Sequence, residues 1–262
     1  MSMLSLCLYL HAAGPTMATI ELARDGLPTA TIVRAARPTP SAALAATELQ
    51  WHLRRITGAS LPIVSDEEAV VGARILVGES AATRALGLAS EDIDPQEYVI
   101  RFLPDTLVLI GRDWRQGDAS DVELGFDTYG APVASTRRVI DYGEATGSPA
   151  PNLAEITLPG MFDDQGTCYA TYAFLEQFCS VRWYGPSDLN IVTPRQETLA
   201  VGGDDVRRST SLKHRHATGG SWPIVAEQWA SPSGDQLELY WRRMRVGGER
   251  WAGNHTIWTK TV

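Results

Sequence analysis

The sequence is poor in cysteine and has no long run of basic or of apolar residues. Its three cysteines, Cys7, Cys168 and Cys179, are too few and too odd in number to form a disulfide framework. The formal net charge is −8 and lysines and arginines do not cluster, so we expect no nucleic-acid partner. No stretch of about 18 apolar residues occurs either, so we expect no transmembrane helix.

The signatures of several enzyme classes are also missing. Neither G-x-x-x-x-G-K-[ST] nor G-x-G-x-x-G occurs, so a nucleotide cofactor has no support. The H-E-x-x-H pattern of zinc hydrolases is absent as well. Residues 78–82 read GESAA and lack the glycine two positions after serine that a nucleophile elbow requires. We therefore expect no cofactor.

What is present indicates a soluble chain with a substantial core. Hydrophobic residues make up 44% of the 262 positions and charged residues make up 21%. These proportions are ordinary for a folded soluble protein. The length suits one large domain or two modest ones.

The first 17 residues allow two interpretations. A short apolar run from Leu4 to Leu10, followed by small residues, resembles the core of a signal peptide, but no lysine or arginine precedes it. Residues 1–17 are therefore either a weak export signal or a non-native leader, with Met17 as the second possible start. The first alternative predicts an extracellular or periplasmic location, and the second leaves a cytoplasmic location open.

Local patterns predict most of the elements up to residue 205. Alternation around an Asp25-Gly26 turn predicts a hairpin, and helical spacing predicts a helix from Ser41, as its N-cap, to Gly58. A buried strand is expected at 73–77 and a second hairpin at 98–110. Residues 114–160 read as a long loop.

A nearly all-apolar helix is expected next, from Thr167 to Cys179, with a strand at 181–184 behind it. A helix that is apolar over most of its girth is buried on several sides. We expect Thr167 to cap its first N–H groups and Asp163 and Asp164 to stabilise its positive end.

The chain changes character near residue 206. A strand at 211–216 and a helix at 237–244 follow, together with five tryptophans: Trp222, Trp229, Trp241, Trp251 and Trp258. One strand–helix unit cannot close a core alone, so we expect the chain to end inside a second domain. The predicted division is a leader at 1–17, an α/β domain at 18–205 and the start of a truncated domain at 206–262.

Three segments together carry a family resemblance. Residues 45–64 read AATELQWHLRRITGASLPIV, residues 73–80 read ARILVGES, and residues 166–188 read GTCYATYAFLEQFCSVRWYGPSD, with IVTP at 191–194. In combination they resemble the N-terminal α/β domain that precedes the catalytic barrel in α-glucuronidases, β-hexosaminidases and related glycoside hydrolases of unknown specificity. The long loop at 114–160 departs from that pattern and puts any shared surface in doubt.

The resemblance implies a fold and a parent activity. The fold is α/β, with a mixed, mostly antiparallel sheet and two main helices on one face, followed by the first βα unit of an incomplete (β/α)8-type barrel. Glycoside hydrolysis needs two carboxyl groups at a defined separation, and in such barrels they lie on later strands. The resemblance therefore implies a glycoside hydrolase whose barrel binds a glycan, and a chain that holds no catalytic residue and is inactive alone.

Five polar or aromatic residues near the C-terminus are candidates for contact with a sugar. His214 and His216 would point to one side of a strand, as a metal pair needs, but no third ligand is nearby, so sugar contact or a structural role is favoured over metal. The side chains of Asn254 and His255 can both donate to and accept from hydroxyl groups. The ring of Trp222 could stack on a sugar. Core packing or an exposed loop is the alternative in each case.

A different class of function is also consistent with these patterns. A non-catalytic carbohydrate-binding or interaction module would use exposed tryptophans and the long loop. Exposed aromatic faces would favour binding, whereas packed rings would favour a supporting domain.

Overall fold

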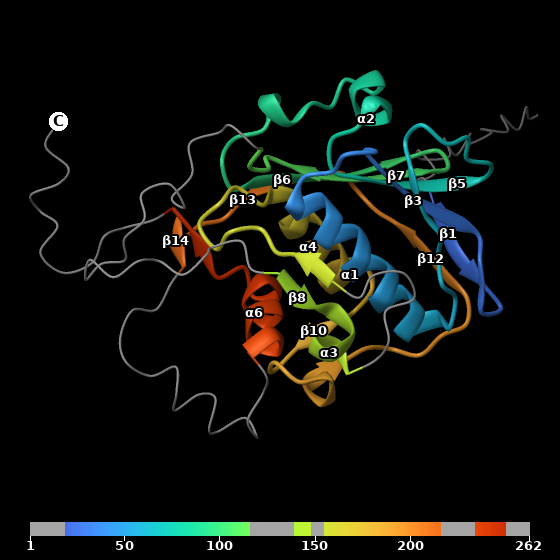
Figure 1. Ribbon diagram of the computed structural model, residues 1–262. Coiled ribbons are helices and arrows are strands. Elements are labelled where there is room, and N and C mark those ends of the chain that lie inside the picture. Colours follow the sequence, from blue (N-terminus) through green and yellow to red (C-terminus); the bar gives the residue numbers. More distant parts are fainter. Residues whose placement is uncertain (1–18, 116–138, 148–154, 216–233, 250–262) are drawn as a thin grey trace, which may run out of the picture.

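The computed structural model describes residues 19–115, 139–147, 155–215 and 234–249, and a six-stranded sheet lies at their centre (Figure 1). Its strands, in spatial order, are β13 (Val206–Ser209), β6 (Glu97–Leu103), β7 (Thr106–Gly111), β5 (Ala73–Val77), β3 (Ala30–Arg34) and β4 (Ile63–Ser65). The four strands from β7 to β4 are parallel. β6 and β13 extend them by antiparallel pairing.

Two long helices pack against each other and against one face of this sheet. α1 (Pro40–Thr57) connects β3 to β4, and α4 (Gly166–Phe178) contacts α1, β6 and β7. The short α2 (Ala81–Ala85) follows β5 and lies on the opposite face, as Figure 1 shows. Parallel neighbouring strands need a crossover between them, and α1 supplies it for β3 and β4.

Side chains of the parallel strands alternate between two cores. Ile32 and Ile75 belong to the large core that α1 and α4 cover, whereas Val33 and Leu76 belong to a smaller core beside α2. Strands that are buried on both faces consist of continuous apolar runs, which explains the uninterrupted sequence Ile-Leu-Val in β5.

Helix α4 is enclosed along its first ten residues, all of which are buried. The sheet covers one side of the helix and α1 covers another. This enclosure explains why the sequence there is apolar around most of the girth of the helix. The strand that follows, β10 (Arg182–Trp183), lies within the predicted strand at 181–184; it buries Trp183 and exposes Arg182.

Smaller elements complete the described structure. The helices are α3 (Tyr142–Thr146) and α6 (Gly234–Arg243), with 3-10 turns at Ser90–Asp92 and Asp188–Asn190. The remaining strands form antiparallel groups. These are β1 (Thr19–Arg24) with β2 (Leu27–Pro28) and β12 (Leu199–Gly202), β10 with β11 (Ile191–Val192), β8 (Val139–Asp141) with β9 (Glu155–Thr157), and β14 (His214–Arg215) with β15 (Gly247–Gly248).

The fold confirms the predicted mixed α/β class with two main helices on one face. The sheet was expected to be mostly antiparallel. The small sheets are antiparallel, but in the six-stranded sheet the pairs β7–β5, β5–β3 and β3–β4 are parallel. The reason is that β3 leaves the predicted first hairpin, which consists of β1 and β2 alone, and enters the central sheet.

Two predicted helix starts are wrong. The N-cap of α1 is Thr39, two residues earlier than the expected Ser41, and Pro40, whose fixed φ suits a first helical position, follows it. α4 has Gln165 at the N-cap position, with no side-chain hydrogen bond from that residue. The predicted end of α1 is confirmed, because Gly58 is a left-handed C-cap with φ of 81°.

The segment from residue 206 contains the expected strand and helix as β14 and α6. β13, at its beginning, pairs with β6 in the central sheet. A domain boundary at 206 and a barrel beyond it remain predictions. The leader at 1–17 lies outside the described residues. None of the described helices is long and apolar enough to cross a membrane.

Candidate functional site

The carboxyl ends of the parallel strands β3, β5 and β7 meet at one edge of the central sheet. The chain that leaves β3 enters α1 on one face, and the chain that leaves the neighbouring β5 enters α2 on the other face. Connections that diverge in this way open a crevice outside the strand ends, which is where open α/β sheets bind ligands.

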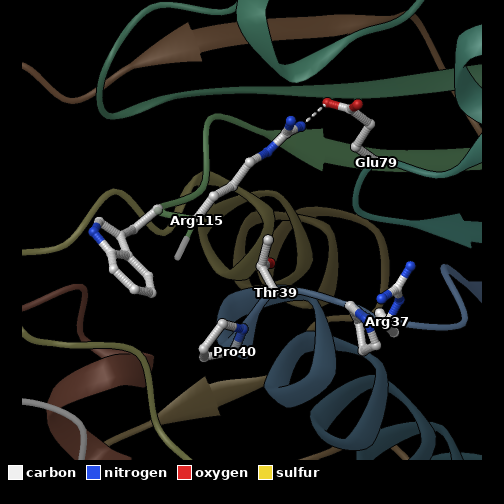
Figure 2. Close-up of a pocket in the computed structure, with 7 residues that line it drawn as sticks. Arg37, Thr39, Pro40, Glu79 and Arg115 are labelled. Atoms are coloured by element: carbon white, nitrogen blue, oxygen red, sulfur yellow. Dashed lines mark hydrogen bonds and ion pairs between the residues drawn. The ribbon is translucent and has the colours of Figure 1, made fainter. Parts of the chain in front are cut away.

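A cavity of about 670 Å³ lies at this place. Its volume falls within the range of roughly 300–1,000 Å³ that small-molecule sites occupy. It is lined by residues that follow β3, β5 and β7, namely Arg37, Pro38, Thr39, Pro40, Glu79, Trp114 and Arg115. Figure 2 shows Glu79 and Arg115 on one side of the cavity and Arg37, Thr39 and Pro40, from the segment that enters α1, on the other.

Glu79 is the one carboxylate among these lining residues, and it is held by several donors. It forms ion pairs with Arg84 and Arg115, and it accepts a hydrogen bond of 2.7 Å from the backbone N–H of Ser90. Its side chain is only 11% exposed. Arg37 is exposed and forms no ion pair with the part of the chain that the structure describes. Among the described lining residues, positive groups therefore outnumber negative ones.

Asp113 lies behind the crevice and joins the starts of both long helices. Its Oδ2 accepts a hydrogen bond of 2.9 Å from Thr39 Oγ1, and its Oδ1 accepts one of 2.9 Å from the backbone N–H of Thr167. The carboxylate is 6% exposed, and this burial raises its pKa. Asp113 therefore serves the positive ends of α1 and α4 as an internal cap, which is the role predicted for Asp163 and Asp164.

Asp163 and Asp164 contact other groups than the start of α4. Asp163 Oδ2 accepts a hydrogen bond of 2.9 Å from the backbone N–H of Gly160. Asp164 lies 3.7 Å from the guanidinium of Arg112, and burial raises the pKa of Asp164. Thr167, predicted as the cap, instead accepts a hydrogen bond of 3.3 Å from the N–H of Gly111.

A second buried polar group joins α6 to α1, on the side of α1 away from the sheet (Figure 1). Arg243 donates two hydrogen bonds to Glu48, of 2.8 and 2.9 Å, and both side chains are at most 1% exposed. The hydroxyl of Tyr142 also donates to Glu48. The guanidinium of Arg243 lies 5.2 Å from the centre of the Trp51 ring.

The charges of this pair stabilise each other. Burial alone would raise the pKa of Glu48, but the charge and hydrogen bonds of Arg243 outweigh it and lower that pKa. Burial alone would lower the pKa of Arg243, and Glu48 raises it instead. Glu48 and Arg243 are therefore both ionised at neutral pH.

His52 lies beside this pair in its neutral form. Its Nε2 accepts a hydrogen bond of 3.0 Å from the indole N–H of Trp183, and its Nδ1 lies 2.7 Å from the backbone oxygen of Glu48. An accepting Nε2 requires the tautomer with its proton on Nδ1. Burial lowers the pKa of His52 to about 4, although Glu48 opposes the shift.

Of the predicted sugar contacts, only His214 lies among the described residues. It stands on β14, where its Nδ1 is 2.9 Å from the backbone oxygen of Glu249 and its ring stacks on Phe162 at 6.5 Å. The other four, His216, Trp222, Asn254 and His255, lie outside the described residues, as do Trp229, Trp251 and Trp258. The described ranges hold no group of three potential metal ligands.

The crevice is hard to predict from the sequence. Its residues belong to three segments that are far apart in the chain, and the sequence around Glu79, at 78–82, matches only part of a serine motif. The useful signal was the continuous apolar run of β5, because the ends of buried parallel strands are the usual place for ligands.

Comparison with known proteins gives limited information. No family model matches the chain, and no curated protein matches it either. Among solved structures, the GH20 β-N-acetylhexosaminidase from Streptomyces coelicolor A3(2) matches 78% of this chain, with a TM-score of 0.40 and 11% sequence identity. The match covers 26% of that enzyme, so this chain spans about a quarter of its length.

Proposed function

We propose that this chain is the accessory α/β part of a carbohydrate-active glycoside hydrolase and that it supports a catalytic barrel. The hydrolase would act on a glycan outside the cytoplasm, and the accessory part would form one wall of the glycan cleft. The resemblance over residues 18–206 supports the family, and the attachment of α6 supports the role of the domain.

The proposal that this domain supports a barrel rests on the way α6 is attached to α1. Arg242 and Arg243 are 2% and 1% exposed, and both insert into the α/β body. Arg242 donates to the backbone oxygen of Pro159 from Nε at 3.0 Å and from Nη2 at 2.9 Å, while Arg243 binds Glu48. Burying an arginine is costly unless its hydrogen bonds are satisfied in a defined geometry. The two arginines therefore allow α6 one orientation on α1.

Directional attachment of this kind suits a platform better than a binding module. An apolar contact alone would let a helix slide or rotate, whereas paired guanidinium groups fix its position. A barrel that continued from this segment would inherit the position of α6. The buried carboxylates of the described residues are those of Glu48, Asp113 and Asp163. They hold Arg243, two helix ends and the backbone N–H of Gly160, so none is offered for acid–base chemistry on a sugar.

A glycosidase assay tests the proposed lack of activity. The purified chain is incubated with 4-nitrophenyl N-acetyl-β-glucosaminide and with 4-nitrophenyl α-glucuronide. An active β-N-acetylhexosaminidase in the same assay confirms that the first substrate can report activity. We expect no release of 4-nitrophenol above buffer from either substrate. Release that scales with the concentration of the chain would contradict the supporting role.

Limited proteolysis tests the attachment itself. Chymotrypsin can cleave after Tyr240 or Trp241 in α6 only when the helix leaves the body. We expect Arg243→Met to accelerate this cleavage, detected by mass spectrometry, while Arg208→Met, an exposed substitution on β13, leaves it unchanged. Equal cleavage in wild type and Arg243→Met would show that the ion pair does not hold α6.

A further inference from the structure

We propose that the crevice at the carboxyl edge of β3, β5 and β7 binds a small organic anion, recognised through a carboxylate or phosphate group attached to a ring. This inference does not depend on the proposed supporting role. It rests on the position, the charge and the lining of the crevice.

The position favours a ligand because it follows from the strand order. β3 and β5 are adjacent, and their following helices lie on opposite faces of the sheet. Such connections diverge and leave a crevice outside the strand ends. The carboxylate of Asp66, directly after β4, spans part of this gap, because it accepts hydrogen bonds from the backbone N–H groups of Ala36 and Ala81. The cavity of about 670 Å³ occupies that gap, between Arg37 and Glu79 (Figure 2).

The charge of the crevice favours an anion. The described lining residues include two guanidinium groups, those of Arg37 and Arg115, and one carboxylate, Glu79, which pairs with Arg115 and with Arg84. Thr39 is the N-cap of α1 and Pro40 is its first residue, so the positive end of an 18-residue helix reaches the same wall. Asp113 compensates that helix from behind, but it is buried and shared with α4. Arg37 is exposed, and its guanidinium can bind an oxyanion in a bidentate manner.

The lining indicates what the anion is attached to. Pro38, Pro40 and Trp114 present apolar ring surfaces in the same cavity. Such surfaces contribute by contact with a carbon skeleton and add nothing to the binding of a bare ion. A sugar acid or a sugar phosphate combines an oxyanion with a ring of suitable size, whereas inorganic phosphate offers the oxyanion alone.

Isothermal titration calorimetry with four probes tests the proposal: glucuronate, glucose 6-phosphate, glucose and inorganic phosphate. At low ionic strength we expect at least one of the two sugar anions to bind with a Kd of about 1 mM or tighter. Glucose and inorganic phosphate should each bind at least about tenfold more weakly than that sugar anion, because glucose lacks the oxyanion and inorganic phosphate lacks the sugar ring. The stronger of the two sugar anions identifies whether the site prefers carboxylate or phosphate. Added salt should weaken the binding.

Two arginine variants locate the binding. Arg37→Gln should weaken the sugar anion about tenfold or more, because it removes a charge-assisted hydrogen bond. Arg54→Gln is the matched control, since Arg54 is an exposed arginine in the last turn of the same helix, about 21 Å of helix rise from Pro40. Binding of glucose as tight as that of the anions, an unchanged Kd in Arg37→Gln, or no heat from either sugar anion at 10 mM (about ten times the expected Kd) would each overturn the proposal.

Discussion

Replacement of Arg243 by methionine is the sharpest test of how this fold is held together. The substitution keeps an unbranched side chain that can still lie against Trp51, but it removes both hydrogen bonds to Glu48. Glu48 is 0% exposed, so its charge would remain in the core with the hydroxyl of Tyr142 as its remaining side-chain donor. Removing one member of a buried ion pair costs about 3–5 kcal/mol, and we expect the lower end because Tyr142 still donates.

The measurement is the free energy of unfolding by urea, followed by the fluorescence of the eight tryptophans at pH 7. Glu48→Gln with Arg243→Met completes a double-mutant cycle, and a coupling energy of about 2 kcal/mol is expected because the double variant leaves no buried charge. Arg208→Met, exposed on β13, should change the stability by less than about 0.5 kcal/mol.

The pH dependence separates lost charge from lost packing. In the wild type the pKa of Glu48 is lowered in the folded state, so its stabilising contribution is present above the unfolded pKa and is lost as the pH falls through the folded pKa. In Arg243→Met that folded pKa should instead be raised, because burial is no longer opposed. The stability gap between wild type and variant should therefore narrow on acidification from pH 7 to about 4. A cost below about 1 kcal/mol, or a gap independent of pH, would refute this reasoning.

Three further outcomes are expected. The pKa of His52 is lowered from about 6.5 to about 4, so the free energy of unfolding of the wild type should fall by up to about 3 kcal/mol as the pH is lowered between those values. His52→Gln should flatten the plot of this free energy against pH across that window. An unchanged slope would contradict a buried neutral imidazole. Gly166→Ala should lower the free energy of unfolding by roughly 3 kcal/mol in the same assay, because the added Cβ would lie 2.5 Å from the backbone oxygen of Glu97. Thr39→Ala, which removes the N-cap of α1, should lower it by about 1 kcal/mol. A smaller loss in Gly166→Ala than in Thr39→Ala would be inconsistent with the close contact at Gly166. Cys168 and Cys179 are buried, and burial raises the pKa of both thiols. They should therefore react with Ellman's reagent only after denaturation. Rapid reaction of either thiol in the native protein, located by mass spectrometry, would disprove its burial.

The sequence predicted the parts of the fold that local chemistry decides. Gly58 ends α1 because a left-handed residue is needed there, and the hairpin of β6 and β7 forms around Pro104 and Asp105 because these residues favour a turn. The apolar girth of α4 predicted its burial correctly. Each of these signals lies within a few residues of the structure that it specifies.

Contacts between distant segments could not be predicted in the same way. Glu48 and Arg243 are 195 positions apart, and nothing within either helix indicates the other. Asp113 caps α4 from 54 positions earlier, whereas Asp163 and Asp164 are closer in sequence and point elsewhere. The site is the hardest part to predict, because a crevice at strand ends can be located only once the strand order is known.

The net charge of −8 and the anion proposed for the crevice are compatible because charge acts locally in salt solution. At physiological ionic strength the Debye length is about 8 Å, so a ligand in the crevice responds mainly to Arg37, Arg115 and Glu79. A nucleic acid would contact a far larger area and meet the acidic surface as a whole, and the absence of such a partner stays a prediction. A net negative charge that disfavours an extended polyanion is therefore compatible with a site for a small anion, and the calorimetric comparison of single sugars should show the effect of Arg37 alone.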